Sequence, residues 1–409
     1  MLNQDYTCEE FLHLIKNIDF KKYFDKLTKK EIKNLFIELE TFVKTEYDFH
    51  SIDSKELEDG KFYYKLNNVK KDKSNLKEVL FDDFVLRKTN KNIKRVYGIE
   101  QSNRFKIIKT LINLFNETND FYILKLDISK FYESIDREEI LKKLNVSILL
   151  SYKTKQILKN FFPKIKTPGL PRGVNISATL SEYYMKNFDK YIKIMDGIFF
   201  YARYVDDIII LSTKKIDFCE IQKNLPKGLN FNLQKKIEIN SKEKKWKFSF
   251  LGYSFEKKEI IKKNKKDYNI EISISKRKIK NIQSKIIKAF LDFRKKKDLK
   301  LLKNRMLFLS ANYPIRNNKI NTSDYNEKRT LHGGNAFNYP FISSHEELKK
   351  LDVFYYKVLN TKTFKKINSC LQQEERKMLR KYSFVCGYKQ RILRNFNLNE
   401  IQKITECWR

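Results

Sequence analysis

The sequence is poor in cysteine, histidine, glycine and proline, with 5, 4, 10 and 6 of them in 409 residues. The cysteines lie far apart and no two have C-x-x-C spacing: Cys8, Cys219, Cys370, Cys386 and Cys407. This scatter argues against a zinc ribbon and against a disulfide framework. It fits a protein of the reducing cytoplasm, where we expect this chain to act.

Long apolar runs are also missing. No stretch approaches the roughly 20 apolar residues of a membrane span. The first residues, 1–6, lack the basic-then-apolar profile of a signal peptide, and no lipidation motif is present. We therefore expect no membrane among the partners of this protein.

Acidic residues are scarce relative to basic ones. The chain has 86 Lys and Arg against 50 Asp and Glu, a net charge of +36. A surplus of this size predicts a polyanionic partner, with nucleic acid as the first candidate. An anionic membrane surface is less favoured, because the basic residues are spread over the whole chain. The hydrophobic fraction of 41% is enough for a folded core, and the length suggests two to three subdomains.

Capping signals and apolar periodicity predict helices over about 9–24, 29–47, 104–116, 151–161 and 177–191, with a further helix capped by Asp136. Strands are predicted over 95–100 and 121–128, in hairpins over 199–211 and 255–274, and before Tyr253. The segment 51–92 is mixed and charged, which suggests short strands and loops. From Ser275 onward the pattern is mostly helical.

Two adjacent acids, Asp206 and Asp207, interrupt the apolar and aromatic hairpin 199–211. Adjacent carboxylates repel each other, so a fold that directs both to one point usually holds a cation there. A polar turn between buried strands is the simpler explanation of the pair alone. However, Asp127 ends another buried strand, and two-metal phosphoryl transfer needs carboxylates from separate elements.

The segment from Glu256 to Lys300 contains the densest basic block, 17 Lys or Arg against 6 acids. Apolar residues recur there at helical spacing: Ile279, Ile282, Ile286, Ala289, Phe290 and Phe293. This predicts a helix with one core face and one cationic face suited to a phosphate backbone. A merely solvated helix face is the alternative.

Several motifs follow one another in the order found in reverse transcriptases, which this sequence resembles from about Arg95 to Tyr253. They are Arg95-x-x-x-Ile99 with Arg104, Leu126 to Tyr132, Gly169 to Gly173 with Ser177, Tyr204-Val205-Asp206-Asp207, Lys235, and Phe250 to Tyr253. The Tyr-x-Asp-Asp box alone is weak, but the ordered set is specific.

The resemblance implies a catalytic centre with two Mg²⁺ ions, for which Mn²⁺ is an alternative. Asp127 and Asp206 would be the principal metal ligands, with Asp207 beside them and Ile128 within the metal site. Lys235 matches a lysine thought to protonate the departing pyrophosphate, although the neighbouring Lys236 competes for this role.

The resemblance also implies how substrates bind. Tyr132 matches the aromatic steric gate that excludes a ribose 2′-hydroxyl, so deoxynucleoside triphosphates are expected as substrates. The other expected nucleotide-binding residues are Arg95, Arg104, Arg172, Gly173 and Ser177. The expected primer grip comprises Phe250, Leu251, Gly252 and Tyr253.

The third motif reads Pro171-Arg172-Gly173, where many reverse transcriptases have Pro-Gln-Gly. Together with Leu180 to Met185, this is most similar to bacterial antiphage defence reverse transcriptases, including the abortive-infection type. Some of those polymerise without a conventional template, prime from a protein tyrosine, use a non-coding RNA or form oligomers. A homo-oligomer or a second protein subunit is therefore a further candidate partner. No nuclease, integrase or RNase H pattern follows, so a stand-alone polymerase is expected.

The expected fold is α+β, a right-hand polymerase. Its expected domains are N-terminal helices and fingers in 1–120, a palm in 121–255 with a fingers segment at about 146–175, and a basic helical thumb with an extension in 256–409. The expected function is RNA-directed DNA synthesis in bacterial defence against phage, with RNA and DNA as partners. A retron-type enzyme making an RNA–DNA hybrid and an RNA-binding scaffold are the alternatives.

Overall fold

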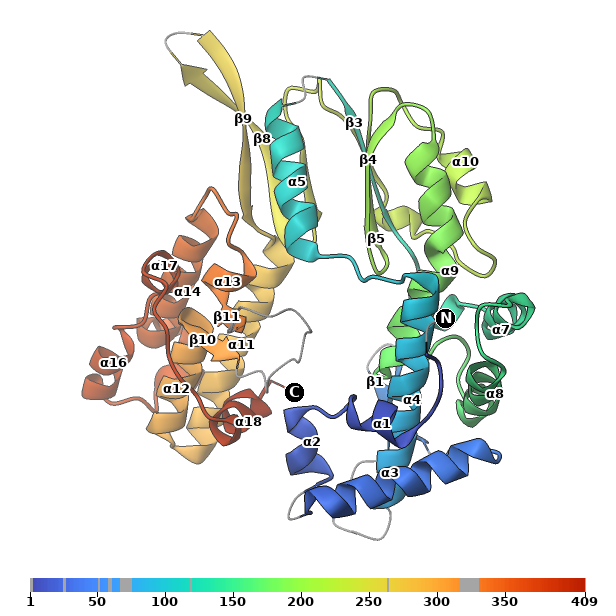
Figure 1. Cartoon of the computed structure of the whole chain (residues 1–409). Coiled ribbons are helices and arrows are strands. Elements are labelled where there is room, and N and C mark those ends of the chain that lie inside the picture. Colours follow the sequence, from blue (N-terminus) through green and yellow to red (C-terminus); the bar gives the residue numbers. More distant parts are fainter. Residues whose placement is uncertain are drawn as a thin grey trace. The chain divides into compact units, whose positions relative to one another are not determined.

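The computed structural model describes residues 3–24, 27–50, 52–57, 61–66, 76–117, 120–262, 265–315 and 331–408. They form two compact units. The first unit contains the described residues up to 107 and from 120 to 241, and the second contains 108–117 and those from 242 onward. Figure 1 shows the elements of both units.

The N-terminal part of the first unit is mainly helical. Its elements are α1 (Cys8–Leu12), α2 (Asn17–Lys22), α3 (Lys29–Lys44), the paired strands β1 (Ile52–Leu57) and β2 (Lys61–Leu66), α4 (Leu76–Tyr97) and the start of α5 (Arg104–Glu117). The predicted helix 29–47 is confirmed as α3, and Thr28 and Glu31 form its capping box. The predicted helix 9–24 is two helices, because the chain turns between α1 and α2.

The short strands predicted within 51–92 are confirmed by β1 and β2. Helix α4 corrects the rest, since loops and strands were expected up to residue 92 and a strand over 95–100. Sequence periodicity failed because α4 buries charged residues together with apolar ones. Arg87 pairs with Asp19 and Asp83 at 2.7 Å each, which satisfies charges that would otherwise mark an exposed face. Gly98, with φ +59°, ends the helix in the left-handed conformation that favours glycine.

A four-stranded antiparallel sheet forms the centre of the first unit. Its strands are β3 (Tyr122–Asp127), β4 (Ile198–Tyr204), β5 (Asp207–Ser212) and β6 (Ile237–Asn240), in the order β4-β5-β3-β6. The four residues that follow Asp207 on β5, residues 208–211, are fully buried. Helix α9 (Asn175–Ile194) packs on β4 and on α4, as Figure 1 shows. The predicted strand 121–128, the hairpin 199–211 and the helix after the glycine-rich loop are thus confirmed.

Short helices connect these strands. They are α6 (Phe131–Ser134), α7 (Arg137–Val146), α8 (Tyr152–Phe161), η2 (Phe162–Lys164), α10 (Phe218–Lys223) and η3 (Leu233–Lys235). Asp136 caps α7 by accepting from the backbone nitrogens of Glu138 and Glu139, and Ser151 caps α8. The cap at Asp136 and the start of a helix at Ser151 were both predicted. A side-chain oxygen at such a position satisfies amides that have no partner within the helix.

The second unit contains residues 108–117 of α5 and an antiparallel sheet, which is followed by helices. The strands of this sheet are β7 (Lys247–Phe250), β8 (Tyr253–Lys262) and β9 (Lys265–Ile274). The remaining elements are α11 (Lys276–Lys296), α12 (Leu299–Ser310), β10 (Asn312–Ile315), β11 (Leu331–Gly334), α13 (Asn335–Asn338), α14 (Glu346–Asn360), η4 (Lys362–Phe364), α15 (Lys365–Asn368), α16 (Gln373–Leu379), α17 (Phe384–Lys389) and α18 (Leu398–Glu406). The predicted hairpin 255–274 and the helical character after Ser275 are confirmed. Helix α11 buries Ile279, Ile286 and Phe290 as its spacing predicts.

The His332-Gly333-Gly334 segment has a packing role in the second unit. A side chain at Gly333 would collide with the ring of Tyr313, and one at Gly334, where φ is +108°, would collide with Asn312. Asn312 is fully buried and accepts a hydrogen bond from the backbone nitrogen of Ala336 at 3.1 Å. The glycines therefore permit a close approach of β10 and β11.

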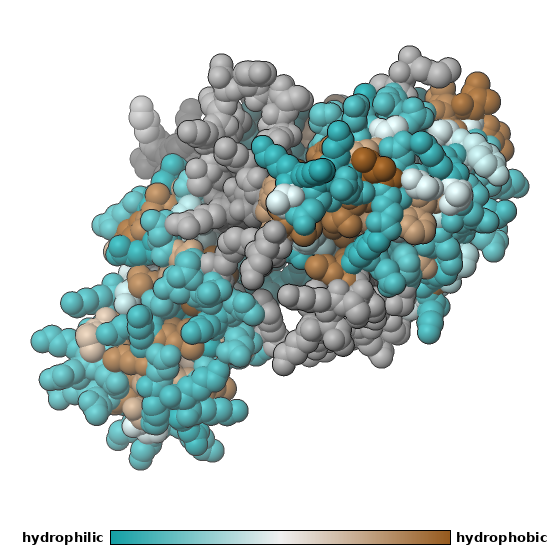
Figure 2. Space-filling model, turned by 60° about the horizontal axis from the view of Figure 1, so that its bottom comes forward, coloured by the Kyte–Doolittle hydropathy of each residue, from teal (hydrophilic) through white to brown (hydrophobic). Residues whose placement is uncertain are grey.

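Among the residues coloured by hydropathy in Figure 2, hydrophilic ones predominate, with hydrophobic ones in smaller areas. None of the helices in the described ranges has the length and hydropathy needed to cross a membrane.

Candidate active site

The tip of the β4–β5 hairpin is a two-residue turn. Tyr204 pairs with Asp207, so Val205 and Asp206 form the connection. Val205 has φ +60°, which is unusual for a β-branched residue. In hairpins, a turn of this kind normally has glycine at its first central position. The tip therefore stores strain, about 1–3 kcal/mol, that the surrounding structure has to offset.

A buried arginine provides this support. Arg203, 4% exposed, donates from Nη1 to the carbonyl oxygen of Val205 at 3.0 Å. The same guanidinium donates to both carboxylate oxygens of Glu182 and of Asp189 on α9, at 2.6–3.2 Å. Burial raises the pKa of the Glu182 carboxyl, although the charge of Arg203 opposes this. The network fixes the turn that carries Asp206 to helix α9.

Backbone pairing brings Asp127 to the same sheet edge. Asp127 lies directly across from Asp207 in the β3–β5 register. The amide of Ile128 donates to the carbonyl oxygen of Asp206 at 3.1 Å. The side chain of Ile128 is buried in the core, so only its backbone could contribute to a metal site. The three predicted carboxylates therefore meet at one edge of the sheet.

The carboxylates perturb one another. Burial raises the pKa of Asp206, and the negative charge of Asp127 raises it further. Burial, followed by the charge of Asp206, raises the pKa of Asp207 to about 6. The positive charges of Lys235 and Arg172 act in the opposite direction on Asp206. This edge of the sheet thus favours the presence of a cation.

Lys235 supplies one positive charge directly. Its Nζ lies 3.0 and 2.9 Å from the two carboxylate oxygens of Asp127. Lys236 instead pairs with Glu238 at 2.7 Å and lies over the ring of Phe218. Of the two lysines that competed in the sequence, Lys235 is the one in contact with the acids.

The donor set fits a hard divalent cation by its chemistry, because all of it is carboxylate oxygen. Within the described part of the chain, no three His, Cys, Asp or Glu side chains are grouped so as to hold a metal by themselves. Mg²⁺ is typically bound by one or two carboxylates together with waters and substrate phosphates, so a ready protein cage is not required. Asp127 and Asp206 could provide those two carboxylates.

Tyr132 lies beside the acids, under an arginine. The guanidinium carbon of Arg172 is 5.1 Å from the centre of the Tyr132 ring. Arg172 also forms a two-pronged ion pair with Glu133, at 2.6 and 3.0 Å. Burial raises the pKa of the Tyr132 hydroxyl, and Asp206 is among the charges that act on it. The arginine that replaces the usual glutamine is therefore held against the ring by Glu133.

The loop 168–173 packs on the turn that carries Tyr132. The amide of Leu170 donates to the carbonyl oxygen of Tyr132 at 2.7 Å. The hydroxyl of Ser177 donates to the carbonyl oxygen of Pro171 at 2.6 Å. Gly169 has φ +71°, and a Cβ there would collide with backbone carbonyls of Tyr132 and Glu133. Gly173, φ +91°, ends the loop. Glycine is needed here for both conformation and space.

The other predicted residues are located as follows. Arg95 is exposed on the last turn of α4, and its charge acts on Lys88. Arg104 is half-buried at the first turn of α5, with its guanidinium 5.6 Å from the ring centre of Phe105. The predicted primer-grip residues belong to the second unit, where Phe250 pairs with Tyr253 across a turn at Leu251 and Gly252. Both turn residues have positive φ, +47° and +83°.

Sequence reasoning missed Arg203, Glu182, Asp189 and Glu133. Arg203 did offer a signal, since an arginine within an otherwise apolar and aromatic strand requires buried partners. The partners themselves could not be found, because α9 and β4 meet only in the folded chain.

Residues 69–255 match the family described as reverse transcriptase (RNA-dependent DNA polymerase). The chain contains a reverse transcriptase domain. The enzyme class that this domain indicates is RNA-directed DNA polymerase, a nucleotidyltransferase, and polymerases of this family generally use divalent metal ions. With its helices and antiparallel sheets, the domain confirms the predicted fold class, an α+β right-hand polymerase.

Solved structures similar to this chain include apo telomerase from Candida tropicalis, at 15% identity and TM-score 0.37, with 56% of this chain and 52% of that chain covered. Telomerase from Candida albicans in complex with a TWJ fragment of telomeric RNA matches at 12% identity and TM-score 0.36, with 83% of this chain and 64% of that chain covered. Apo telomerase from Candida tropicalis truncated from the C-terminal domain matches at 15% identity and TM-score 0.35, with 51% of this chain and 53% of that chain covered. The chain thus spans about half the length of the Candida tropicalis structures. A search of curated proteins found no match. Because the TM-scores are low, the reverse transcriptase domain is assigned from the family match.

Proposed function

We propose that this protein synthesises DNA from deoxynucleoside triphosphates on an RNA template by two-metal phosphoryl transfer. The observation that carries the proposal is the meeting of Asp127, Asp206 and Asp207 with Lys235 at one edge of the β3–β5 pair. Phosphoryl transfer needs little covalent help from the protein, so positioned charges of this kind suffice. In this proposal residues 121–255 are the palm, residues 1–120 and about 146–175 supply the fingers, and 256–409 form the thumb and its extension.

Asp127 and Asp206, with Asp207 beside them, would hold two Mg²⁺ ions. When bound, such ions activate a hydroxyl nucleophile and neutralise charge on the phosphates. The chain itself contributes proton transfer. Lys235 carries its protons on Nζ within hydrogen-bond distance of Asp127, so it is placed to donate one to a departing pyrophosphate oxygen.

Tyr132 would select deoxynucleotides over ribonucleotides. Its ring is fixed from one side by Arg172, and Arg172 is fixed in turn by Glu133. A ring that cannot move aside excludes an added hydroxyl more effectively than a mobile one. The ion pair also means that Arg172 acts mainly as a support for Tyr132, rather than as a free cation for the template.

The nucleic acid partner is supported by charge. Helix α11 has an apolar face in the core, while its basic residues Lys276, Arg277 and Lys280 are exposed. Such a face suits phosphates, whose contacts dominate affinity for nucleic acids. We assign the protein to bacterial antiphage defence because of Arg172 in the third motif and the sequence Leu180 to Met185. Sequencing nucleic acid that co-purifies with the protein would reveal a retron instead, if one defined RNA–DNA hybrid were found.

The test uses Asp206→Asn in the purified full chain. Losing one ligand should lower incorporation of deoxynucleotides about 10³-fold, since metal stabilisation of charge is worth several kcal/mol. The fold should persist, because burial and repulsion already disfavour the Asp206 charge. Asp196→Asn, a change of an exposed acid paired with Lys214, is the matched control. Undiminished incorporation by Asp206→Asn would overturn the proposal. For the defence role, cells carrying Asp206→Asn should lose protection against phage in a plaque assay, and cells carrying the control should keep it.

A further inference from the structure

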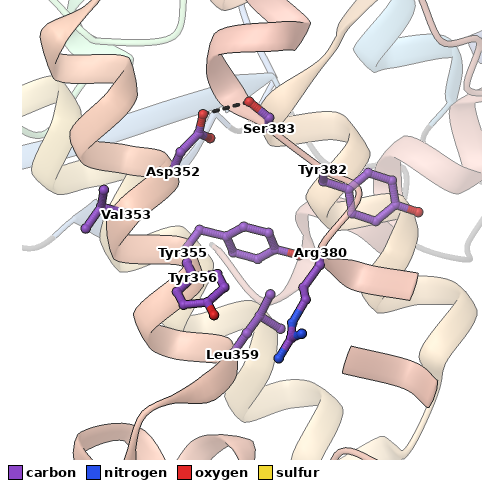
Figure 3. Close-up of a pocket in the computed structure, with 8 residues that line it drawn as sticks. All are labelled: Asp352, Val353, Tyr355, Tyr356, Leu359, Arg380, Tyr382 and Ser383. Carbon is purple, nitrogen blue, oxygen red and sulfur yellow. Dashed lines mark hydrogen bonds between the residues drawn. The ribbon is translucent and has the colours of Figure 1, made fainter. Parts of the chain in front are cut away.

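A cavity in the second unit is formed by residues that do not belong to the candidate active site. It measures about 350 Å³ and opens between α14 and the segment that joins α16 to α17. Helix α14 contributes Asp352, Val353, Tyr355, Tyr356 and Leu359, and the joining segment contributes Arg380, Tyr382 and Ser383. Its volume is in the range of small-ligand sites, about 300–1,000 Å³. In Figure 3, Asp352 and Tyr355 of α14 lie across from the residues of the joining segment.

Hydrogen bonds fix the walls of this cavity. The hydroxyl of Tyr355 donates to the carbonyl oxygen of Leu379 at 2.9 Å, which ties α14 to the end of α16. Asp352 accepts from the hydroxyl of Ser383 and from the amide of Phe384, both at 2.6 Å. The bond between Asp352 and Ser383 is drawn in Figure 3. The site is therefore preformed, which lowers the entropic cost of binding a ligand.

The rim of the cavity combines an exposed aromatic ring with a cation. Tyr356 is 55% exposed, although tyrosine is large and mostly apolar. The guanidinium of Arg380 lies 5.7 Å from its ring centre, and Asn360 accepts hydrogen bonds from the same guanidinium. Nearby lysines on these elements, Lys357 and Lys381, are also exposed. An aromatic platform next to several cations is the usual composition of a single-strand binding site.

We propose that this cavity binds a base of single-stranded nucleic acid, with Tyr356 stacking on the base and Arg380 contacting the adjacent phosphate. The inference rests on the proposed function in one respect, that nucleic acid is the partner. Charge favours nucleic acid among the possible occupants, because the chain has a net charge of +36 and exposed lysines flank the cation of the lining, Arg380. The acid of the lining, Asp352, is already bonded to Ser383 and Phe384. A flat base suits tyrosine walls, while every base offers a face for stacking, so sequence tolerance is expected.

The test measures binding of the full chain to a fluorescein-labelled oligouridine of about 12 nucleotides by anisotropy. Tyr356→Leu should weaken binding about tenfold, and Tyr356→Phe, which keeps the ring, should stay within about twofold of the unchanged protein. Arg380→Gln should reduce the slope of log affinity against log salt by about 0.7, the value for one phosphate contact on a single strand. Tyr152→Ala, a change of another exposed tyrosine outside this cavity, is the matched control and should have no effect.

The inference is overturned if Tyr356→Leu binds like the unchanged protein, which would leave a protein partner for the cavity, or if Tyr356→Phe is as weak as Tyr356→Leu. A 4-thiouridine version of the oligonucleotide provides an independent readout. Photo-crosslinks are expected in the peptides that contain Tyr356 or Tyr382, and crosslinks confined to other peptides would contradict the proposal. Asp206→Asn should bind the oligonucleotide normally while it loses incorporation. Failure of the polymerase proposal can therefore be distinguished from failure of this one.

Discussion

Replacing Arg203 by methionine should destabilise the protein and inactivate the site by separate routes. Methionine keeps much of the length and loses the charge and all five hydrogen bonds to Glu182, Asp189 and Val205. Removing one partner from a buried ion pair costs about 3–5 kcal/mol, because the other charges stay buried without compensation. The side chains of Glu182 and Asp189 are only 13% and 19% exposed, so solvent would screen them little.

The lost stability should depend on pH in a defined direction. Burial already raises the pKa of Glu182, and removing the positive charge of Arg203 should raise it further. A carboxyl whose pKa is higher in the folded than in the unfolded state favours folding when protonated. The free energy of unfolding of Arg203→Met should therefore recover as pH falls from about 7 toward the unfolded value near 4.3. Urea titrations at several pH values would measure this.

A compensated variant separates stability from positioning. In Arg203→Met with Glu182→Gln and Asp189→Asn, no buried charge is left unpaired, so much of the stability should return. Activity should stay low, because nothing then donates to the Val205 carbonyl that holds the turn at Asp206. Arg305→Met is the matched control: Arg305 is equally buried and pairs with Asp292 in the second unit. It should lose stability, and enzyme that remains folded should retain activity. Full activity in the compensated variant would refute a positioning role for Arg203.

Three further changes test other parts of the first unit. Gly169→Ala should lower the free energy of unfolding by at least about 1 kcal/mol more than Gly98→Ala, as measured by thermal or urea unfolding. Both glycines have positive φ, but only at Gly169 would a Cβ collide with backbone carbonyls. Equal losses in the two variants would contradict the clash. Lys235→Gln should lower single-turnover incorporation about 10²–10⁴-fold, because Lys235 is the proposed proton donor. Lys236→Gln should change incorporation little, since Lys236 pairs with Glu238. The reverse result would assign the proton donor to Lys236. Burial raises the pKa of Asp82 to about 6, so the free energy of unfolding of the wild-type protein should fall as pH rises from about 4 to 6. Asp82→Asn should remove this fall and should be up to about 3 kcal/mol more stable than the wild type above pH 6. An unchanged pH profile in Asp82→Asn would count against the raised pKa.

Elements whose pattern agrees with their environment could be predicted from the sequence. The strand before Asp127, the hairpin around Asp206 and the cap at Asp136 were all placed correctly. In each case the signal is local, either a run of apolar β-formers or an oxygen at an N-cap. Helix α4 could not be predicted in this way, because its charged residues Asp82, Asp83 and Lys88 are buried and their partners lie far away in sequence.

The residues of the candidate site could also be predicted from the sequence, since each motif consists of neighbouring residues. The contacts between the motifs could not be predicted. The choice of Lys235 over Lys236 depends on a one-residue difference in direction at the end of a short 3₁₀ helix. The pairing of Arg172 with Glu133 depends on a loop that packs back on the turn of Tyr132.

The sequence by itself determined the acids, their order along the chain, the cationic surplus and the periodicity of most elements. These follow from neighbouring residues and from the charge of each side chain. Only the tertiary structure decided which charges face one another: Lys235 with Asp127, Glu133 with Arg172, and Arg203 with α9 and the strained turn. Coulomb energy and desolvation depend on distance in space, and separation along the chain does not set that distance.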